Sequence, residues 1–299
     1  MLLHSYLSTL DINTTVSTWQ GGGKVSSALT AVGQLGGISS MIGMIGADSY
    51  GDFLLHDFAY YNVDTSRMIQ DGNNAFSVVL SDLQTHGRNI LSRPTTSRSY
   101  TLEDIDEAFV ASHDILHLER ADAVSHKLAD IIHEAGGLVA FDGDGYSEDT
   151  QNMLPKIDIF IGSEFYYGVL FGESEAYEEN LEKVRAMRPS IVVFTLGDKG
   201  SVVKWEGGYY VAPGYKVAVV DTVGAGDVYH GAYLFAIAKG MAPDESAQFA
   251  NAVAAIKCTA IGGRAGVPSY EMTIDFMEKG TYDRALIEEK LARYESFSN

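Results

Sequence analysis

Short apolar segments alternate with longer amphipathic segments along most of this chain, and this alternation limits the fold more than any other feature. Five apolar, mostly β-branched runs predict strands: Ile38–Ile45, Ile115–Leu118, Leu138–Phe141, Ile157–Ile161 and Ile191–Leu196. Five segments have helical periodicity: Val25–Leu35, Gly51–Tyr61, Leu102–Ala111, Ala123–Ala135 and Glu175–Met187. Strands that are apolar on both faces and alternate with helices are typical of a layered α/β domain with a mostly parallel sheet. Ligands of such sheets bind at the loops that follow the strands.

Two segments depart from this rhythm and predict a small antiparallel sheet. Thr14–Gln20 alternates polar and apolar residues, as a strand with one solvated face does. Ala75–Leu83 and Arg88–Leu91 are joined by a short polar segment that contains glycine, which predicts a β-hairpin. We expect these pieces to pair as a lid over one edge of the main domain. The expected division is a core of residues 24–71 and 99–299 and a lid of residues 8–23 and 72–98.

The composition narrows the range of partners. The chain of 299 residues has 21 Lys and Arg against 40 Asp and Glu, a formal net charge of −19. Such a charge opposes binding to nucleic acid or to an anionic membrane surface. The single cysteine, Cys258, excludes an internal disulfide framework. The sequence has neither the pattern of a signal peptide nor an apolar run long enough to span a bilayer, and we therefore predict a cytoplasmic protein.

The segment richest in chemistry is Val219–Tyr233, which contains the string Asp-Thr-Val-Gly-Ala-Gly-Asp. We expect a strand to end at Asp221, a tight turn to follow, and Asp227 to stand at the start of an apolar helix. Small residues let a backbone approach a ligand closely, and free N–H groups at a helix start attract negative charge. Asp227 could then accept a proton from a hydroxyl that attacks a phosphoryl group. The alternative is that Asp227 only caps the helix, a common role of Asp.

This string resembles the D-T-x-G-A-G-D motif of the ribokinase family, the PfkB-type carbohydrate kinases. Other segments resemble further family motifs, and they do so in the family's order. These are the glycine motif at Gly21–Leu29, the G-x-x-G-x-D-x-x-G turn at Ile42–Gly51, the strand before an acidic position at Ile157–Glu164, the T-x-G-x-x-G loop at Thr195–Gly200 and the late loop at Ile261–Pro268. The resemblance covers most of the chain. It implies a ribokinase-like three-layer α/β/α core with a mostly parallel central sheet and a small antiparallel β lid.

The resemblance also implies an activity and assigns residues to it. It implies a kinase that uses ATP and Mg²⁺ to phosphorylate a primary hydroxyl of a sugar or sugar derivative. Asp227 would be the base, and the amides of Gly224, Ala225 and Gly226 would form the anion hole. Thr195, Gly197 and Gly200 would line the nucleotide, with Glu164 near the phosphates and Mg²⁺. The alternative for Gly197 and Gly200 is a plain hairpin turn, and for Glu164 it is an exposed carboxylate at a helix start.

The implied substrate and metal contacts follow the same motifs. Gly22 and Gly23 would let a sugar lie against bare backbone, and Ser27 would offer a hydroxyl to it or to a neighbouring loop. Most of the family has Asn at the position of Ser27. Arg88 could reach the substrate, although a solvated surface arginine is the alternative. The positions of Asp221, Gly262 and Gly266 match those that bind a monovalent cation in many family members, which implies a potassium site.

The sequence departs from the family at its beginning. The family opens with a core strand that ends in G-x-x-x-x-D, whose Asp binds sugar hydroxyls. Here Asp11 is the one acid that precedes Gly21. We therefore expect either that Met1 lies downstream of the natural start or that this chain lacks a core strand. A missing central strand would leave backbone groups unpaired.

Three alternatives remain open at this stage. A nucleoside kinase would share the same machinery, and Trp19, Phe76 and Tyr100 could stack on a base. A non-catalytic sugar- or nucleotide-binding protein would keep the phosphate site without turnover. The outer faces of the lid strands could also pair two subunits as a homodimer.

Overall fold

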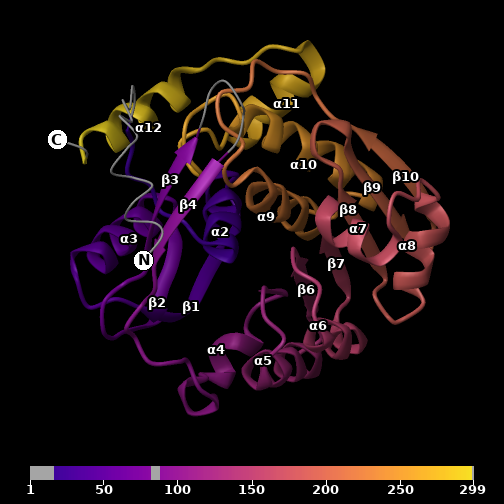
Figure 1. Ribbon diagram of the computed structural model, residues 1–299, viewed down its shortest axis with the longest axis horizontal. Helices are drawn as coiled ribbons and strands as arrows, with labels where there is room; N and C mark the ends of the chain where they lie inside the picture. Colours follow the sequence, from indigo (N-terminus) through magenta and orange to yellow (C-terminus); the bar gives the residue numbers. More distant parts are fainter. Residues whose placement is uncertain (1–16, 82–87, 298–299) are drawn as a thin grey trace, which may run out of the picture.

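The computed structural model describes residues 17–81 and 88–297, and strands alternate with helices along most of them (Figure 1). The strands are β1 (Ser39–Ile45), β2 (Val63–Gln70), β3 (Phe76–Ser81), β4 (Arg88–Arg93), β5 (Ile115–Leu118), β6 (Leu138–Gly143), β7 (Ile159–Gly162), β8 (Ile191–Thr195), β9 (Gly200–Trp205) and β10 (Gly208–Pro213). The α-helices are α2 (Lys24–Gln34), α3 (Ser49–Tyr60), α4 (Glu107–Ala111), α5 (Ala123–Glu134), α6 (Glu148–Met153), α7 (Glu164–Phe171), α8 (Tyr177–Arg185), α9 (Ala225–Ala238), α10 (Pro243–Lys257), α11 (Tyr270–Lys279) and α12 (Ala285–Glu295). Three short 3₁₀ turns are η1 (Leu102–Asp104), η2 (Leu154–Lys156) and η3 (Gly197–Lys199).

The main sheet has six strands in the order β10-β9-β8-β7-β6-β5. Strands β5 to β8 run parallel to one another, whereas β9 is antiparallel to both β8 and β10. The predicted mostly parallel sheet is therefore confirmed. Because the carboxyl ends of β5 to β8 meet at one edge, the loops after these strands lie close together there.

Helices cover both faces of this sheet, and the alternation of side chains along each strand explains how. In β7, Ile159 and Ile161 pack with α9 and α10, while Phe160 points to the other face and packs with α5, α7 and α8. All three side chains are fully buried. Burial of one such side chain contributes roughly 1.5–3 kcal/mol relative to exposure. Strand β7 carries no polar face, since neither of its faces meets solvent.

Strands β1 and β2 form a separate two-stranded parallel sheet. Within residues 17–81 and 88–297, no strand joins β1 to β5, so the sheet is interrupted between them. Side-chain hydrogen bonds link the two sides, at 2.9 Å between Nε2 of His113 and Oγ of Ser40 and at 2.8 Å from Nε of Arg67 to Oδ2 of Asp106. The expectation of a missing core strand concerns residues 1–16, which lie outside the described residues.

The small antiparallel sheet consists of β3 and β4, which pair from Phe76 with Arg93 to Ser81 with Arg88. The expected hairpin is confirmed. The expected third piece, Thr14–Gln20, lies partly outside the described residues, and its described part, residues 17–20, is in no strand. Aromatic stacking joins this segment to the lid instead: the ring of Trp19 lies 5.7 Å from that of Tyr50, which lies 5.4 Å from that of Phe76.

Two further expected elements differ from the structure, and one strand was not expected. No strand ends at Asp221, since residues 214–222 belong to no helix or strand. The helix expected over Leu102–Ala111 is divided into η1 and the short helix α4, because Ile105 between them is extended. The carboxylates of Asp104 and Asp106 each accept local backbone N–H groups, which favours caps over a continuous helix. Strand β2 was not predicted, since five of its eight residues are polar or charged and its apolar residues do not alternate regularly.

Candidate active site

Helix α9 begins in a conformation that leaves backbone N–H groups free. Gly224 is its N-cap, with φ 74° and ψ 6°, a left-handed conformation that favours glycine. The amide of Ala225 donates to the carbonyl oxygen of Thr222 at 3.1 Å. The amides of Gly224, Gly226 and Asp227 have no hydrogen-bond partner among the residues that the structure describes. Of the three amides expected in the anion hole, those of Gly224 and Gly226 are therefore available, whereas that of Ala225 is already bonded.

Asp227 does not cap its own helix. It is the third residue of α9, and its carboxylate accepts no hydrogen bond from any described residue. The caps of other helices behave differently: Asp48 accepts the amide of Gly51 at 3.0 Å, and Asp122 accepts the amide of Ser125 at 2.9 Å. The structural alternative for Asp227 therefore fails, and its carboxylate is free to act on a ligand.

Burial raises the pKa of the Asp227 carboxyl to about 6, and the nearby charge of Asp142 adds to this effect. The ammonium group of Lys24 acts in the opposite direction, while Asp144 and Glu119 raise the pKa further. A carboxylate with a pKa near neutrality accepts a proton more effectively than an ordinary aspartate does. Its environment therefore suits Asp227 to act as a general base.

Lys24 links the first turn of α2 to the end of β6. Its Nζ lies 2.8 Å from Oδ2 of Asp144 and 4.0 Å from Oδ1 of Asp142, which is buried. Lys24, Glu119, Asp142 and Asp144 were not among the expected site residues. The position of Lys24, directly after the three glycines, was the sequence feature that could have identified it as a site residue.

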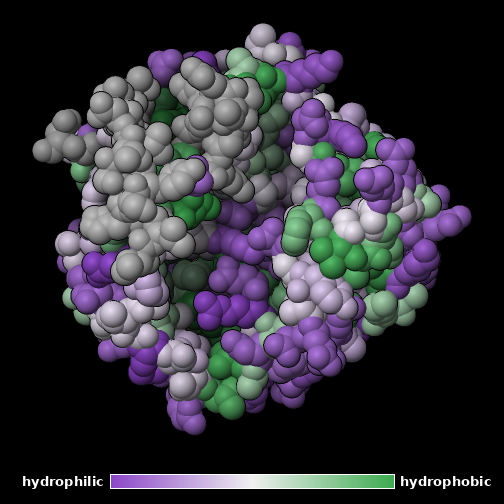
Figure 2. Space-filling view, in the orientation of Figure 1, coloured by the Kyte–Doolittle hydropathy of each residue, from purple (hydrophilic) through white to green (hydrophobic). Residues whose placement is uncertain are grey.

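A pocket of about 710 Å³ lies beside these charges. Its lining includes Lys24, Glu119, Asp122, Asp142 and Asp149, so acids outnumber bases in it. The face drawn in Figure 2 is hollowed near its middle, and hydrophilic residues gather in the hollow. A pocket of this size accommodates a small polar ligand.

The three glycines before α2 have three different surroundings. A Cβ atom on Gly21 would lie 2.0 Å from Nη1 of Arg264, so the chain passes directly over that guanidinium. Gly23 has φ 94°, which favours glycine, whereas nothing lies within 4 Å of a Cβ atom on Gly22. Gly22 is therefore the glycine of the three that faces open space. Ser27, by contrast, is 2% exposed within α2.

Two expected substrate contacts fall outside what the structure describes. Asp11 precedes the described residues, and Arg88 is the first residue of β4 with a side chain outside them. Of the arginines that flank the hairpin, Arg98 donates to the carboxylate of Asp104 at 2.6 and 2.7 Å. It behaves as a paired surface arginine.

The expected nucleotide residues meet at the carboxyl ends of β7 and β8. Thr195 ends β8, and its Oγ1 lies 3.4 Å from the carbonyl oxygen of Gly162, which ends β7. Glu164 opens α7, and its Oε2 lies 3.7 Å from the position of a Cβ on Gly197. Gly200 has φ 96°, and a Cβ there would lie 2.2 Å from the carbonyl oxygen of Ala212, so packing of the hairpin explains this glycine without a ligand.

Asp221, Gly262 and Gly266 also lie together, but contacts within the protein occupy them. The carboxylate of Asp221 accepts the amide of Val223 at 2.9 Å and that of Gly262 at 2.8 Å. The buried ammonium of Lys257 donates to the carbonyl oxygen of Asp221 at 2.9 Å. A Cβ on Gly266 would lie 2.2 Å from the carbonyl oxygen of Lys257. The positive charge of Lys257, the last residue of α10, already lies against Asp221, so these residues do not fit an open potassium site.

The profile of the family described as pfkB family carbohydrate kinase matches residues 11–269, which is most of the chain. The chain belongs to the pfkB family. It is 26% identical over 266 residues to a ribokinase of Haemophilus influenzae, covering 86% of this chain and 87% of that protein. It is 27% identical over 273 residues to a fructokinase of Klebsiella pneumoniae, covering 83% of this chain and 88% of that protein.

A solved structure supports the fold assignment. The structure of a putative Ribokinase II from E. coli, in complex with ATP and Mg²⁺, has a TM-score of 0.79 with 19% identity. The match covers 91% of this chain and 94% of that one. The pfkB member described here therefore has the ribokinase-like fold, and its relatives identify it as a sugar kinase at the level of the family. Among its described residues, no helix is long and apolar enough to cross a membrane.

Proposed function

We propose that this protein is an ATP-dependent sugar kinase that transfers the γ-phosphate of ATP to a primary hydroxyl of a sugar or sugar derivative. The observation that carries the proposal is the free carboxylate of Asp227 beside the unbonded amides of Gly224 and Gly226. A base next to an anion-binding helix start is what phosphoryl transfer to an alcohol requires. Membership of the pfkB family gives the same reaction class.

In the proposed reaction, Asp227 accepts the proton of the acceptor hydroxyl while the oxygen of that hydroxyl forms a bond to the γ-phosphorus. The bond between that phosphorus and the β,γ-bridging oxygen breaks, and ADP leaves with the electron pair. The amides of Gly224 and Gly226 donate to the oxygens of the transferring group, where negative charge is concentrated. The products are ADP and the phosphorylated sugar, with one proton held on Asp227 until solvent removes it.

We assign the nucleotide to the carboxyl ends of β7 and β8. Thr195 and Gly197 would line the nucleotide site, and the backbone N–H groups of the turn at Gly200 would form its end. Mg²⁺ neutralises phosphate charge when it is bound, and it is usually held by one or two carboxylates together with the phosphates of the substrate. Glu164 suits that part, since it opens α7 close to Gly197. Among the described residues, no group of three or more acidic, His or Cys side chains is arranged to hold a metal by itself.

We place the acceptor between the glycine loop (residues 21–23) and the start of α9, with Gly22 against it.

The two alternative functions receive less support. Trp19 and Phe76, which could stack on a nucleoside base, both stack on Tyr50 instead. A non-catalytic binding protein has no need of a free carboxylate with a pKa raised to about 6. The lid strands expose the apolar side chains of Val78, Val79 and Ile90. We therefore keep a separate proposal, that two subunits pair through the lid, and light scattering tests it by measuring the molecular mass in solution.

The decisive experiment is formation of ADP from ATP and Mg²⁺ with D-ribose, D-fructose and adenosine as acceptors. Asp227→Asn is the test variant, and Asp106→Asn is its matched control, since Asp106 caps α4 and does not line the pocket. We expect turnover of about 1–100 per second with a sugar for the wild type and the control. Loss of the base should reduce the rate of the test variant by about 10²–10⁴-fold. Equal rates in the two variants would refute the role of Asp227, and turnover with adenosine alone would favour the nucleoside kinase.

A further inference from the structure

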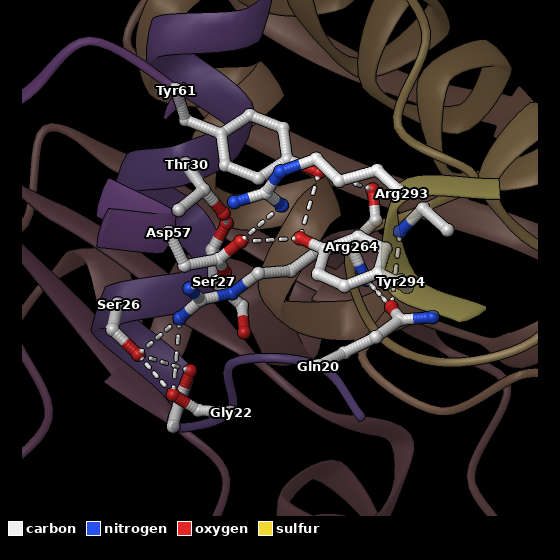
Figure 3. A network of polar contacts seen from close by, with 12 residues as sticks. Gln20, Gly22, Ser26, Ser27, Thr30, Asp57, Tyr61, Arg264, Arg293 and Tyr294 are labelled. Atoms are coloured by element: carbon white, nitrogen blue, oxygen red, sulfur yellow. Dashed lines mark hydrogen bonds and ion pairs between the residues drawn. The ribbon is translucent and has the colours of Figure 1, made fainter. Parts of the chain in front are cut away.

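Arg264 carries a charge in the interior of the protein, and its contacts reach three separate elements. It is 0% exposed, and its Nη1 lies 2.6 Å from Oδ2 of Asp57 in α3. Its Nη2 donates to the carbonyl oxygen of Gly22 at 3.2 Å and to Oγ of Ser26 at 3.1 Å. Figure 3 shows the guanidinium between Asp57 on one side and Gly22 with Ser26 on the other.

The carboxylate of Asp57 is bonded from its far side as well. The other carboxylate oxygen of Asp57 accepts Nη1 of Arg293 at 2.7 Å and the hydroxyl of Tyr294 at 2.7 Å, both from α12 (Figure 3). Buried ion pairs of this kind contribute little net stability, because desolvation of the two charges offsets their attraction. What such a network does supply is fixed geometry, since the planar guanidinium holds several acceptors at once.

The backbone of Arg264 is tied to the same segment as its side chain. Oε1 of Gln20 accepts the amide of Arg264 at 2.9 Å and the amide of Ala265 at 3.0 Å. Nε2 of Gln20 donates to the carbonyl oxygen of Ile261 at 2.9 Å. The hydroxyl of Ser26 also donates to the carbonyl oxygen of Gly22. The loop of residues 261–266 thus holds the glycine loop through these hydrogen bonds. Because Gly21 has no side chain, there is room beside it for the guanidinium of Arg264.

The loop of residues 261–266 touches the anion-binding end of α9 on its other side. A Cβ on Gly224 would lie 3.1 Å from Cα of Gly263. The amide of Gly262 donates to Oδ2 of Asp221 at 2.8 Å, just before the turn into α9. One short loop therefore contacts both the proposed acceptor loop and the proposed phosphate site.

We propose that Arg264 is a positioning residue that fixes the glycine loop relative to the start of α9, so that an acceptor lying against Gly22 presents its hydroxyl to Asp227. This inference rests on the proposed function and adds to it a residue that contacts neither substrate. The physical reason is geometric. Phosphoryl transfer needs the hydroxyl oxygen in line with the γ-phosphorus, and displacement of the acceptor by about 1 Å can cost 10²-fold in rate.

The test compares Arg264→Lys with Tyr294→Phe. Lysine keeps a cation opposite Asp57, but its single nitrogen cannot also hold Gly22 and Ser26. Tyr294→Phe weakens the same network from α12, and none of its described contacts reaches residues 20–26. With D-ribose or D-fructose, whichever the wild type phosphorylates, we expect Arg264→Lys to lower kcat/KM for the sugar by about tenfold or more. We expect KM for ATP to change by less than about twofold in both variants, since the nucleotide residues are not in this network.

Hydrogen exchange gives a second readout that needs no substrate. In Arg264→Lys the amides of residues 20–26 should exchange about tenfold faster or more, whereas in Tyr294→Phe they should stay within about twofold of the wild type. Unchanged exchange in Arg264→Lys, or equal acceleration in both variants, would overturn the proposal. Faster exchange in Arg264→Lys together with an unchanged kcat/KM for the sugar would also overturn the proposal. If the wild type turns over no sugar, the proposed function fails, and hydrogen exchange alone then decides whether Arg264 holds the glycine loop.

Discussion

Gly231 of α9 lies directly against Ala28 of α2: a Cβ atom on Gly231 would stand 2.1 Å from the carbonyl oxygen of Ala28. Asp227 and Lys24 each precede this contact by four residues, one turn along their own helices. The contact therefore brings the two helix starts together, and with them the carboxylate that we propose as the base and the ammonium group that lowers its pKa.

Replacement of Gly231 by Ala should destabilise the protein and separate these helix starts. The methyl group would overlap a backbone oxygen that cannot move alone, and overpacking of this kind costs about 1–3 kcal/mol. The measurement is the free energy of unfolding in urea. Gly168→Ala in α7 is the matched control, because nothing lies within 4 Å of its Cβ position. There the gain in helix propensity should leave stability equal or higher, and an equal loss in both variants would contradict the prediction.

The reaction rate should depend on one ionisation of Asp227. Its pKa is raised to about 6, so the base is mostly protonated below pH 6 and ionised above it. We expect kcat/KM for the sugar to rise about tenfold per pH unit below this value and to level off above it. The pH profile of the wild type from pH 5 to pH 9 measures this directly. A profile that is flat across pH 6 would show that another group is the base.

Removal of the Lys24 charge should move that profile. The ammonium lowers the pKa of Asp227, so Lys24→Gln should shift the acidic limb to higher pH. Lys127→Gln is the matched control, since Lys127 pairs with Glu107 at 2.6 Å on the surface. A shift of equal size in both variants would indicate a general effect of net charge.

Asp227→Asn should stabilise the protein at alkaline pH. The pKa of the carboxyl rises from 3.8 to about 6 on folding, so the folded state holds the proton more tightly, and stability is lost as pH increases through about 6. The amide cannot ionise, and the variant should therefore exceed the wild type by up to about 3 kcal/mol at pH 8. The difference should shrink towards pH 4.5. Urea unfolding at the two pH values is the measurement, and a difference that grows at acidic pH would contradict the assigned sign.

The acceptor should be uncharged rather than phosphorylated. The pocket beside Asp227 is lined by the carboxylates of Glu119, Asp122, Asp142 and Asp149 and by Lys24, Arg120 and His126. Lys24 is already paired with Asp144 at 2.8 Å, and Arg120 lies 4.0 Å from Glu119. A second phosphate would meet this negative field, and like-charge contact costs several kcal/mol. D-fructose should therefore exceed fructose 6-phosphate in kcat/KM by about tenfold or more, corresponding to at least about 1.4 kcal/mol. Preference for the phosphate ester would contradict this reasoning.

Exchange of potassium for sodium should leave the rate within about twofold, since a hard cation needs several free oxygens and those of Asp221 are already bonded. The sequence resemblance alone implies the opposite result. Parallel assays in KCl and NaCl at equal ionic strength decide between the two. Activation by potassium of tenfold or more would contradict this prediction and support a potassium site.

The periodic parts of the fold could be predicted from the sequence, because local pattern and burial agree there. Strands such as Ile191–Thr195 are apolar on both faces, which is typical of a sheet covered by helices on both sides. The irregular parts could not. The break between η1 and α4 depends on side-chain caps, and the polar strand β2 is held mainly by pairing with β1. Local side-chain caps decided the first of these elements, and pairing between strands decided the second.

The same division holds for the candidate site. The sequence by itself determined the role proposed for Asp227, because Gly-Ala-Gly-Asp encodes a local turn, a helix start and a base within a few residues. Only the tertiary structure decided the partners of that turn. Lys24 and Asp142 reach Asp227 from segments far away along the chain, and Arg264 lies under Gly21 across an interval of 243 residues, 264 minus 21. Such contacts follow from how layers pack and where charges are buried, and no spacing within one segment of sequence records them.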